Sequence, residues 1–123
     1  MKHLKPYNES LMLSDDMYQT ITDMSLDLVD NGFQVDILQR AVIDIVIWKH
    51  KGDDWHIPYK FDKECSDFMV SINSYMTSNG YKLKEVTIVE SSSPNTRFNT
   101  IRLSQRVLNM HLVEEVSITF SKV

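Results

Sequence analysis

The chain has 123 residues, 42% of them hydrophobic, and a formal net charge of -4 at pH 7. This length and apolar content are enough for one domain with its own hydrophobic core. The acidic balance disfavours nucleic-acid binding, which depends on basic side chains, and a single cysteine excludes an internal disulfide.

The sequence predicts a protein of a reducing cytoplasm with no membrane segment. Met1–Ser10 lacks the apolar core of a signal peptide, and the longest apolar run, Val42–Trp48, is too short to span a bilayer. The charges are uneven: residues 1–40 carry three basic and seven acidic side chains, whereas residues 82–123 carry six basic and four acidic ones. This polarity could support self-association head to tail, or it could be ordinary surface variation.

Residues 1–13 contain Pro6 and no regular hydrophobic spacing. We therefore expect an N-terminal arm, followed by a single domain over residues 14–123.

An amphipathic helix is predicted from Ser14 to Asn31-Gly32. Ser14 is suited to cap its first turn, and Asn31-Gly32 to end it in a left-handed conformation. The apolar residues that recur at helical spacing are Met17, Ile21, Met24 and Leu28. The opposite face, which carries Asp23, Asp27 and Asp30, is either solvated or an acidic surface for a basic partner.

Two strands should follow this helix. Phe33, Val35 and Ile37 alternate with polar residues, which indicates a strand with one buried face. Val42–Trp48 is apolar on nearly both sides and fits a central strand. Asp44 interrupts it, and we expect this carboxylate near a solvated edge or paired with a lysine.

After a turn at Lys51–Asp54, the segment Trp55–Phe61 is dense in aromatic residues. It could form a short edge strand in a hairpin with the preceding strand. It could instead form an exposed ledge for a protein partner, with contacts from Trp55, His56 and Tyr59.

A second helix should begin at Asp62, which can cap it, and end at Asn79-Gly80. Cys65 falls on its apolar stripe, so a buried, unreactive thiol is expected. The succession of helix, Asn-Gly, aromatic residue and strand occurs at Asn31-Gly32-Phe33 and again at Asn79-Gly80-Tyr81. The two halves could be copies, or they could share common capping chemistry.

The remaining chain reads as a β region. We expect a strand from Tyr81 to Val89 with a bulge near Lys84-Glu85, a loop at Ser91–Asn95, a hairpin strand at Phe98–Leu103, an irregular segment at Ser104–Leu112 and a last strand over Val116–Phe120. The predicted fold class is α+β, in the order α-β-β-(β)-α-β-β-β, with one largely antiparallel sheet and two helices on one face.

Two segments carry a resemblance. Lys2–Ser10 reads Lys-x-x-Lys-x-Tyr-x-Glu-Ser, and Leu26–Val35 contains a helix-to-strand junction ending Gly-Phe-x-Val. Both resemble segments of small uncharacterised α+β proteins of large tailed bacteriophages, some of which carry N-terminal tags for packaging into the head. The resemblance implies a phage-encoded protein, with the arm as a packaging or docking segment, and brings no catalytic residue.

No familiar catalytic or metal pattern is present. The four histidines lack metal-ligand spacing, and none of the three glycines forms a phosphate-binding loop, so we expect no metal and no cofactor. The densest polar cluster comprises His50, Asp53, Asp54 and His56, and it supports an enzyme only as the weakest alternative.

The leading hypothesis is a non-enzymatic protein-interaction or assembly module, with self-association and association with a virion as its narrower forms. Its candidate contacts are the acidic helix face, the aromatic ledge and the arm. A nucleic-acid-associated regulator is the alternative, with Arg97, Arg102 and Arg106 as its basic contacts.

Overall fold

The structure is a computed structural model that describes residues 13–51, 55–90, 96–98 and 112–123. Its elements, in chain order, are α2 (Asp15–Met24), α3 (Leu26–Asp30), β1 (Phe33–Gln39), β2 (Ile43–Lys51), β3 (Trp55–His56), α4 (Lys63–Ser78), β4 (Tyr81–Glu90), β5 (Thr96–Phe98) and β6 (Val113–Lys122). The predicted α+β class with an antiparallel sheet is confirmed.

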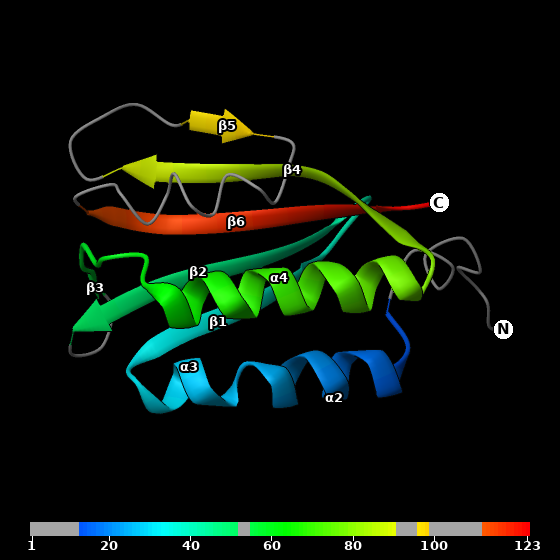
Figure 1. The fold of residues 1–123 in the computed structure, drawn as a ribbon, viewed down its shortest axis with the longest axis horizontal. Coiled ribbons are helices and arrows are strands. Elements are labelled where there is room, and N and C mark those ends of the chain that lie inside the picture. Colours follow the sequence, from blue (N-terminus) through cyan, green and yellow to red (C-terminus); the bar gives the residue numbers. More distant parts are fainter. Residues whose placement is uncertain (1–12, 52–54, 91–95, 99–111) are drawn as a thin grey trace, which may run out of the picture.

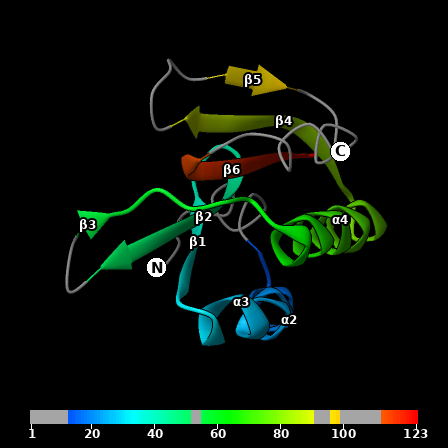
Figure 2. The same ribbon diagram turned by 60° about the vertical axis from the view of Figure 1, so that its left-hand side comes forward.

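The sheet runs in the order β1-β2-β6-β4-β5, and the short strand β3 extends it by pairing with one end of β2. Every pair of neighbouring strands is antiparallel. The helices cover one face of the sheet (Figures 1 and 2), where α3 packs against β1 and α4 against β4. The last strand of the chain is thus inserted between β2 and β4.

The core lies between the sheet and the helices. Alternate residues of the two central strands, β2 and β6, are 1% exposed or less: Ile43, Ile45, Ile47, Val116, Ile118 and Phe120. From the helices, Ile21, Leu28, Ile72 and Met76 close the same cluster. Every second residue of these strands and the residues at helical spacing in the helices thus face the same core. The predicted inward face of the first helix is confirmed.

The predicted first helix is interrupted at Ser25, so the prediction of one continuous helix was wrong. The Ser25 hydroxyl donates to the Thr22 carbonyl at 2.7 Å, and its amide is shared between the carbonyls of Ile21 and Thr22. A serine that bonds back to its own helix competes with the regular ladder. The helix therefore ends at Met24 and restarts at Leu26.

Both predicted helix starts are confirmed. The Ser14 hydroxyl accepts from the Met17 amide at 3.1 Å, and the Asp62 carboxylate accepts from the Cys65 amide at 3.0 Å. Leu13, which we assigned to the arm, is only 8% exposed, and its amide donates to the Gln39 side chain at 2.8 Å. The packed domain thus begins at least one residue earlier than predicted.

The strand boundaries differ at several places. Val42 lies in the connection that precedes β2, and the bulge in β4 falls between Leu83 and Glu85, as predicted. The edge-strand interpretation of the segment Trp55–Phe61 is confirmed only for Trp55–His56, which form β3 and pair with β2. β5 begins at Thr96, before the predicted Phe98, and pairs with β4. Residues 99–103 of that predicted strand and residues 104–111 of the predicted irregular segment lie outside the described ranges.

None of the helices in the described residues combines the length and the apolar character that a bilayer span requires.

Candidate functional site

The charged side chains of α2 and α3 are all acidic. Between Asp15 and Asp30 the sequence contains five aspartates and no lysine, arginine or histidine. The predicted contacts Asp23, Asp27 and Asp30 are all exposed. Asp15, Asp16 and Asp27 lie in first turns, where the helix dipole favours a carboxylate. Asp30 lies at the C-terminal end of α3, where a carboxylate is disfavoured by about 0.3–1 kcal/mol. The helix dipole therefore accounts for three of these aspartates but not for Asp23 and Asp30, which lie in the last turns of α2 and α3.

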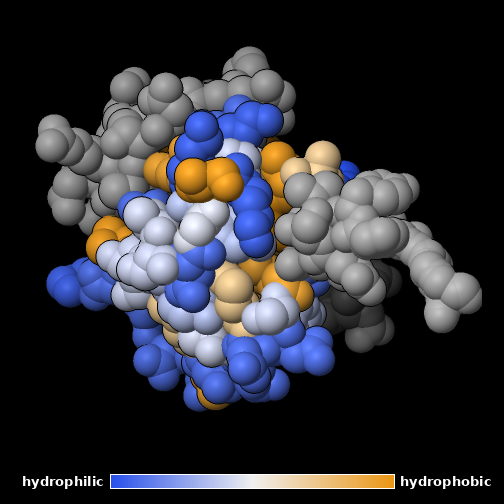
Figure 3. All heavy atoms as spheres, turned by 90° about the vertical axis from the view of Figure 1, so that its right-hand side faces the viewer, coloured by the Kyte–Doolittle hydropathy of each residue, from blue (hydrophilic) through white to orange (hydrophobic). Residues whose placement is uncertain are grey.

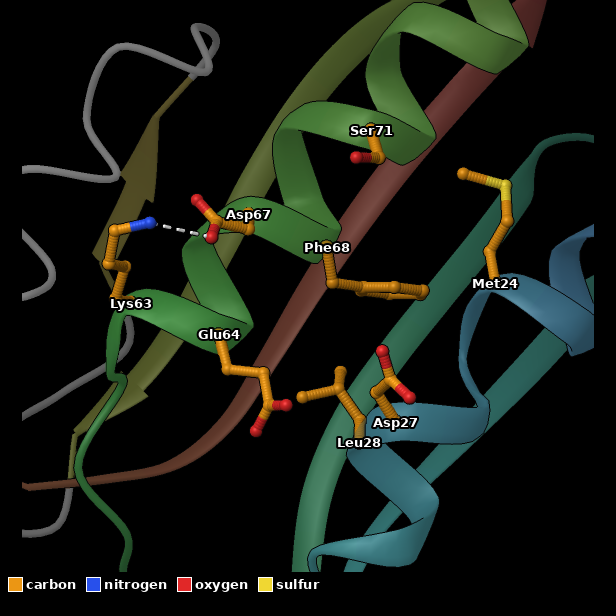
Figure 4. Close-up of a pocket in the computed structure, with 8 residues that line it drawn as sticks. All are labelled: Met24, Asp27, Leu28, Lys63, Glu64, Asp67, Phe68 and Ser71. Carbon is orange, nitrogen blue, oxygen red and sulfur yellow. Dashed lines mark hydrogen bonds and ion pairs between the residues drawn. The ribbon is translucent and has the colours of Figure 1, made fainter.

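A groove of about 560 Å³ separates α3 from α4. Met24, Leu28 and Phe68 form its apolar floor, and its rims carry polar residues from both helices. Figure 4 shows Phe68 extending from α4 toward α3, while Asp27 and Glu64 project from opposite helices. Leu28 and Phe68 are at most 6% exposed, so the floor is largely closed and the rims are what a partner would meet.

The α4 rim of the groove continues the acidic surface. Asp67 forms an ion pair with Lys63 at 2.9 Å, but the two side chains are 64% and 85% exposed. Such a pair contributes little stability, about 0–1 kcal/mol, and is easily exchanged for another cation. Glu64 accepts from the Asn31 side chain at 2.7 Å, which joins the end of α3 to the start of α4. Asp27, Glu64 and Asp67 thus present carboxylates along one groove.

The predicted aromatic ledge is wrong for Tyr59, which is 4% exposed. Its hydroxyl donates to the Ile47 carbonyl at 2.6 Å, and its ring meets Phe33 edge-on at 5.1 Å between centroids. Burial raises the pKa of Tyr59 far above its ordinary value, with smaller contributions from Cys65 and Glu115. This tyrosine anchors the chain between β3 and α4 to the core. The ledge contacts Trp55 and His56 form β3, but their side chains lie outside the described part.

A second, shallower depression of about 500 Å³ lies beside this segment. Exposed Pro58 and Lys60 line it together with Lys49, Asn31 and Glu64. Because Asn31 and Glu64 are also bonded to each other next to the acidic groove, the two depressions adjoin at that pair. The lining of this second depression is mixed in charge, because it contains both lysines and carboxylates.

The alternative sites are only partly described. Arg97 lies in β5 opposite Thr87, while its side chain and the whole of Arg102 and Arg106 lie outside the described residues. His50 lies opposite His56 in the β2–β3 pair, and Asp53 and Asp54 lie outside the described residues. Among the described residues, no group of histidine, cysteine, aspartate or glutamate side chains could hold a metal ion. Both alternatives stay predictions.

Cys65 is confirmed as a buried thiol. Its side chain is fully buried on α4, and burial together with the neighbouring Asp62 carboxylate raises its pKa to about 12. A thiol with so high a pKa is protonated at neutral pH and is a poor nucleophile.

Sequence reasoning missed a polar network on the sheet face opposite the helices. The Asp36 carboxylate accepts from the Trp48 indole at 2.7 Å and from the Gln34 side chain at 2.9 Å. Asp44 accepts from Arg40 at 3.1 Å and from the Thr119 hydroxyl at 2.5 Å, so its partners are an arginine and a threonine, and the predicted lysine is wrong. The alternation of Asp36 with apolar neighbours was the available signal. Both carboxylates are therefore hydrogen-bonded to side chains on this face of the sheet.

A comparison with protein-family models, curated proteins and solved structures found no match. The bacteriophage resemblance therefore stays a prediction.

Seen from the right-hand end of Figure 1, the described surface is mainly hydrophilic, with hydrophobic residues in small separate patches (Figure 3). Two surfaces are candidates for contacts with a partner: the acidic groove, and the strand β1 at the margin of the sheet.

Proposed function

We propose that the protein is a non-enzymatic interaction module that docks a basic segment of a protein partner along the groove between α3 and α4. The observation that carries this proposal is that Asp27, from a run of five aspartates without a basic residue on α2 and α3, lines the groove together with Glu64 and Asp67 of α4. Like charges held this close repel one another, and a cationic partner would relieve that repulsion.

The partner's chemistry follows from the shape of the groove. Because Leu28 and Phe68 are nearly closed to solvent, there is no deep pocket for a large anchor side chain. Met24 remains partly exposed and offers a small apolar contact. An amphipathic helix with lysine or arginine on both flanks of a narrow apolar stripe suits this surface. Electrostatic complementarity of this type favours a fast, salt-sensitive association.

The test uses a lysine-rich amphipathic helical peptide as probe, titrated against the full chain at low and physiological salt. Replacing Asp23, Asp27 and Asp30 together by asparagine should weaken binding about tenfold, because each exposed ion pair contributes about 0.2–1 kcal/mol. The matched control replaces three acidic residues of the sheet, Glu85, Glu114 and Glu115, by glutamine and should leave the affinity unchanged. Equal weakening by both triple variants would mean that binding depends only on the net charge of the protein, and it would reject the groove as the binding site.

The resemblance to bacteriophage proteins supports a narrower form of this proposal, in which the module is a virion-associated component. Removing Met1–Ser10 should then leave folding intact and abolish incorporation into particles. Unchanged incorporation would reject a packaging role for the arm and leave the groove proposal standing.

A further inference from the structure

The outer edge of β1 is a surface that neither the core nor the groove uses. β1 ends the strand order of the sheet, and within the described ranges it pairs with β2 alone. Its seven residues keep one register with β2, from Phe33 opposite Lys49 to Gln39 opposite Ile43, without a bulge. The strand contains no lysine and no proline. Proteins normally use such residues or a bulge to keep an edge from pairing with another chain.

The hydrogen-bond alternation shows which backbone groups of β1 point outward. Lys49 of β2 lies opposite Phe33, yet its carbonyl accepts from the Ile57 amide at 2.8 Å, on the other side of β2. In an antiparallel ladder the N–H and C=O of one residue point to the same side, and successive residues alternate. Phe33, Val35 and Ile37 therefore direct their backbone groups away from β2, toward the open edge.

Apolar side chains flank this open edge. Val35 and Ile37 point toward the helices but are only partly buried, in contrast to their neighbours on β2. On α2 and α3, Tyr18 is 44% exposed and Val29 is 46% exposed. Within α3, helical spacing places Val29 on the side opposite Asp27, which lines the groove, and hence on the side of the β1 edge. Among the described residues, no strand pairs with this side of β1, and exposed Val29 lies beside it.

We propose that a second copy of this chain pairs with β1, antiparallel and edge to edge, so that two sheets become one in a two-fold symmetric dimer. The self-complementarity of the strand selects the second copy as the occupant. With Val35 opposite Val35 of the second copy, Phe33 meets Ile37 on the helix side and Gln34 meets Asp36 on the other side. All the outward backbone groups of these apolar residues then find partners.

Charge and symmetry agree with this register. Pairing centred on Asp36 would place two carboxylates opposite each other, which is unfavourable, whereas the Val35 register avoids this contact. Arg40 follows the end of β1 and is 70% exposed, while Asp30 precedes its start. An antiparallel arrangement brings each Arg40 toward Asp30 of the second copy, twice by symmetry. The α2–α3 rods of the two copies become neighbours on one face, with Val29 between them.

The mass of the full chain in solution, measured by light scattering over a concentration series, tests the proposal. We expect a dimer of twice the 14.4 kDa chain mass. Val29→Lys should raise its dissociation constant by at least an order of magnitude, because it places a charge in the contact. Val70→Lys is the matched control: Val70 on α4 has the same 46% exposure and should leave the dimer unchanged. Val35→Pro removes an outward amide without removing a bond to β2, and should also yield monomers.

Amide hydrogen exchange distinguishes edge pairing from any other dimer. The amides of Phe33, Val35 and Ile37 should exchange more slowly as the concentration rises, while those of Gln34 and Asp36, already bonded to β2, should not change. A chain that stays monomeric, a dimer that survives Val29→Lys, or concentration-independent exchange at Val35 would overturn the proposal. If Val35→Pro fails to fold, Val29→Lys and the exchange data decide. A groove variant limited to Asp23 and Asp27, which keeps the Asp30–Arg40 contacts, separates the two proposals, because it should weaken peptide binding without dissociating the dimer.

Discussion

The two helix-to-strand junctions of the chain use the same local chemistry in different surroundings. At each, an asparagine side chain donates to the carbonyl four residues earlier: Asn31 to Asp27 at 2.9 Å and Asn79 to Tyr75 at 2.8 Å. The glycine that follows has a positive φ, 91° at Gly32 and 89° at Gly80. The helix ends there because only glycine reaches this region without steric cost.

The next residue completes the likeness. Phe33 is 6% exposed and Tyr81 is 2% exposed, and each ring has a lysine ammonium above it. The distance from Nζ to the ring centroid is 4.9 Å for Lys49 over Phe33 and 5.1 Å for Lys122 over Tyr81. Both lysines come from strands that neighbour the aromatic residue, so this part of the pattern is tertiary.

Beyond the junctions the two units diverge. β4 lies between β6 and β5, whereas β1 ends the sheet. α4 is a continuous helix of 16 residues with six buried side chains, while α2 and α3 are separated at Ser25 and bury one each, Ile21 and Leu28. The comparison teaches that equal capping chemistry ends a helix equally well in the centre and at the margin of a sheet. Burial, and with it stability, depends on position in the sheet.

The largest effect should come from emptying the core beneath α4. Ile72 is fully buried, and Ile72→Ala should lower the free energy of unfolding by about 2–5 kcal/mol, through lost transfer energy and the cavity left behind. Leu28→Ala, at the margin next to the groove, should cost less, since its surroundings can relax or hydrate. Urea unfolding measures both, with exposed Val70→Ala as a control near zero. An equal loss at Leu28 and Ile72 would break the distinction between the two units.

The two glycines should show no such difference in stability between the units, because their backbone conformations match. Gly32→Ala and Gly80→Ala should each destabilise the protein by about 1–2 kcal/mol, the cost of a left-handed conformation for an L-residue. A Cβ at Gly80 would meet nothing within 4 Å, and one at Gly32 would make ordinary contact with Lys49 Cε at 3.5 Å, so neither is sterically blocked. Replacement by asparagine should cost less. Thermal unfolding tests this, and a large difference between the two positions would contradict a purely local cause.

The helix caps should have smaller effects of similar size in the two units. Ser14→Ala and Asp62→Ala each remove an acceptor for a first-turn amide and should cost about 1 kcal/mol. Ser14→Asp and Asp62→Ser keep an acceptor and should retain most of the stability. The measurement is again urea unfolding at neutral pH. No loss in either alanine variant would mean that solvent replaces the cap.

At neutral pH the smallest effect should come from the thiol of α4. Because the pKa of Cys65 is raised to about 12 from an ordinary value of 9.0, the folded state keeps a proton that the unfolded state loses. Stability should therefore be insensitive to this group below about pH 9 and should fall as the pH rises from there toward 12. Cys65→Ala should flatten part of that decline in unfolding measured at pH 8–10.5. Buried Tyr59, whose pKa is also raised, supplies a further loss at the upper end. An unchanged slope in Cys65→Ala would contradict the assignment.

Several features were predictable because they depend on residues close together in the sequence. The caps at Ser14 and Asp62, the two glycine stops, the buried stripe with Cys65 and the bulge after Leu83 follow from side-chain spacing and backbone preferences. The interruption at Ser25 was missed because a serine inside a helical period is usually tolerated. Tyr59 was misassigned because an aromatic run next to a proline has the same appearance whether it packs inward or faces a partner.

The sequence alone determined the helices, most strand segments, the acidic character of α2 and α3, and the inward faces, since each arises from interactions over a few residues. The tertiary structure decided that β6 lies between β2 and β4, that Tyr59 reaches the Ile47 carbonyl, that Asp27 faces Glu64 across a groove, and that β1 is left at the margin. These outcomes join residues far apart in the chain, and many arrangements share the same local periods. Only the packing of the three helices against one shared sheet face selects among them.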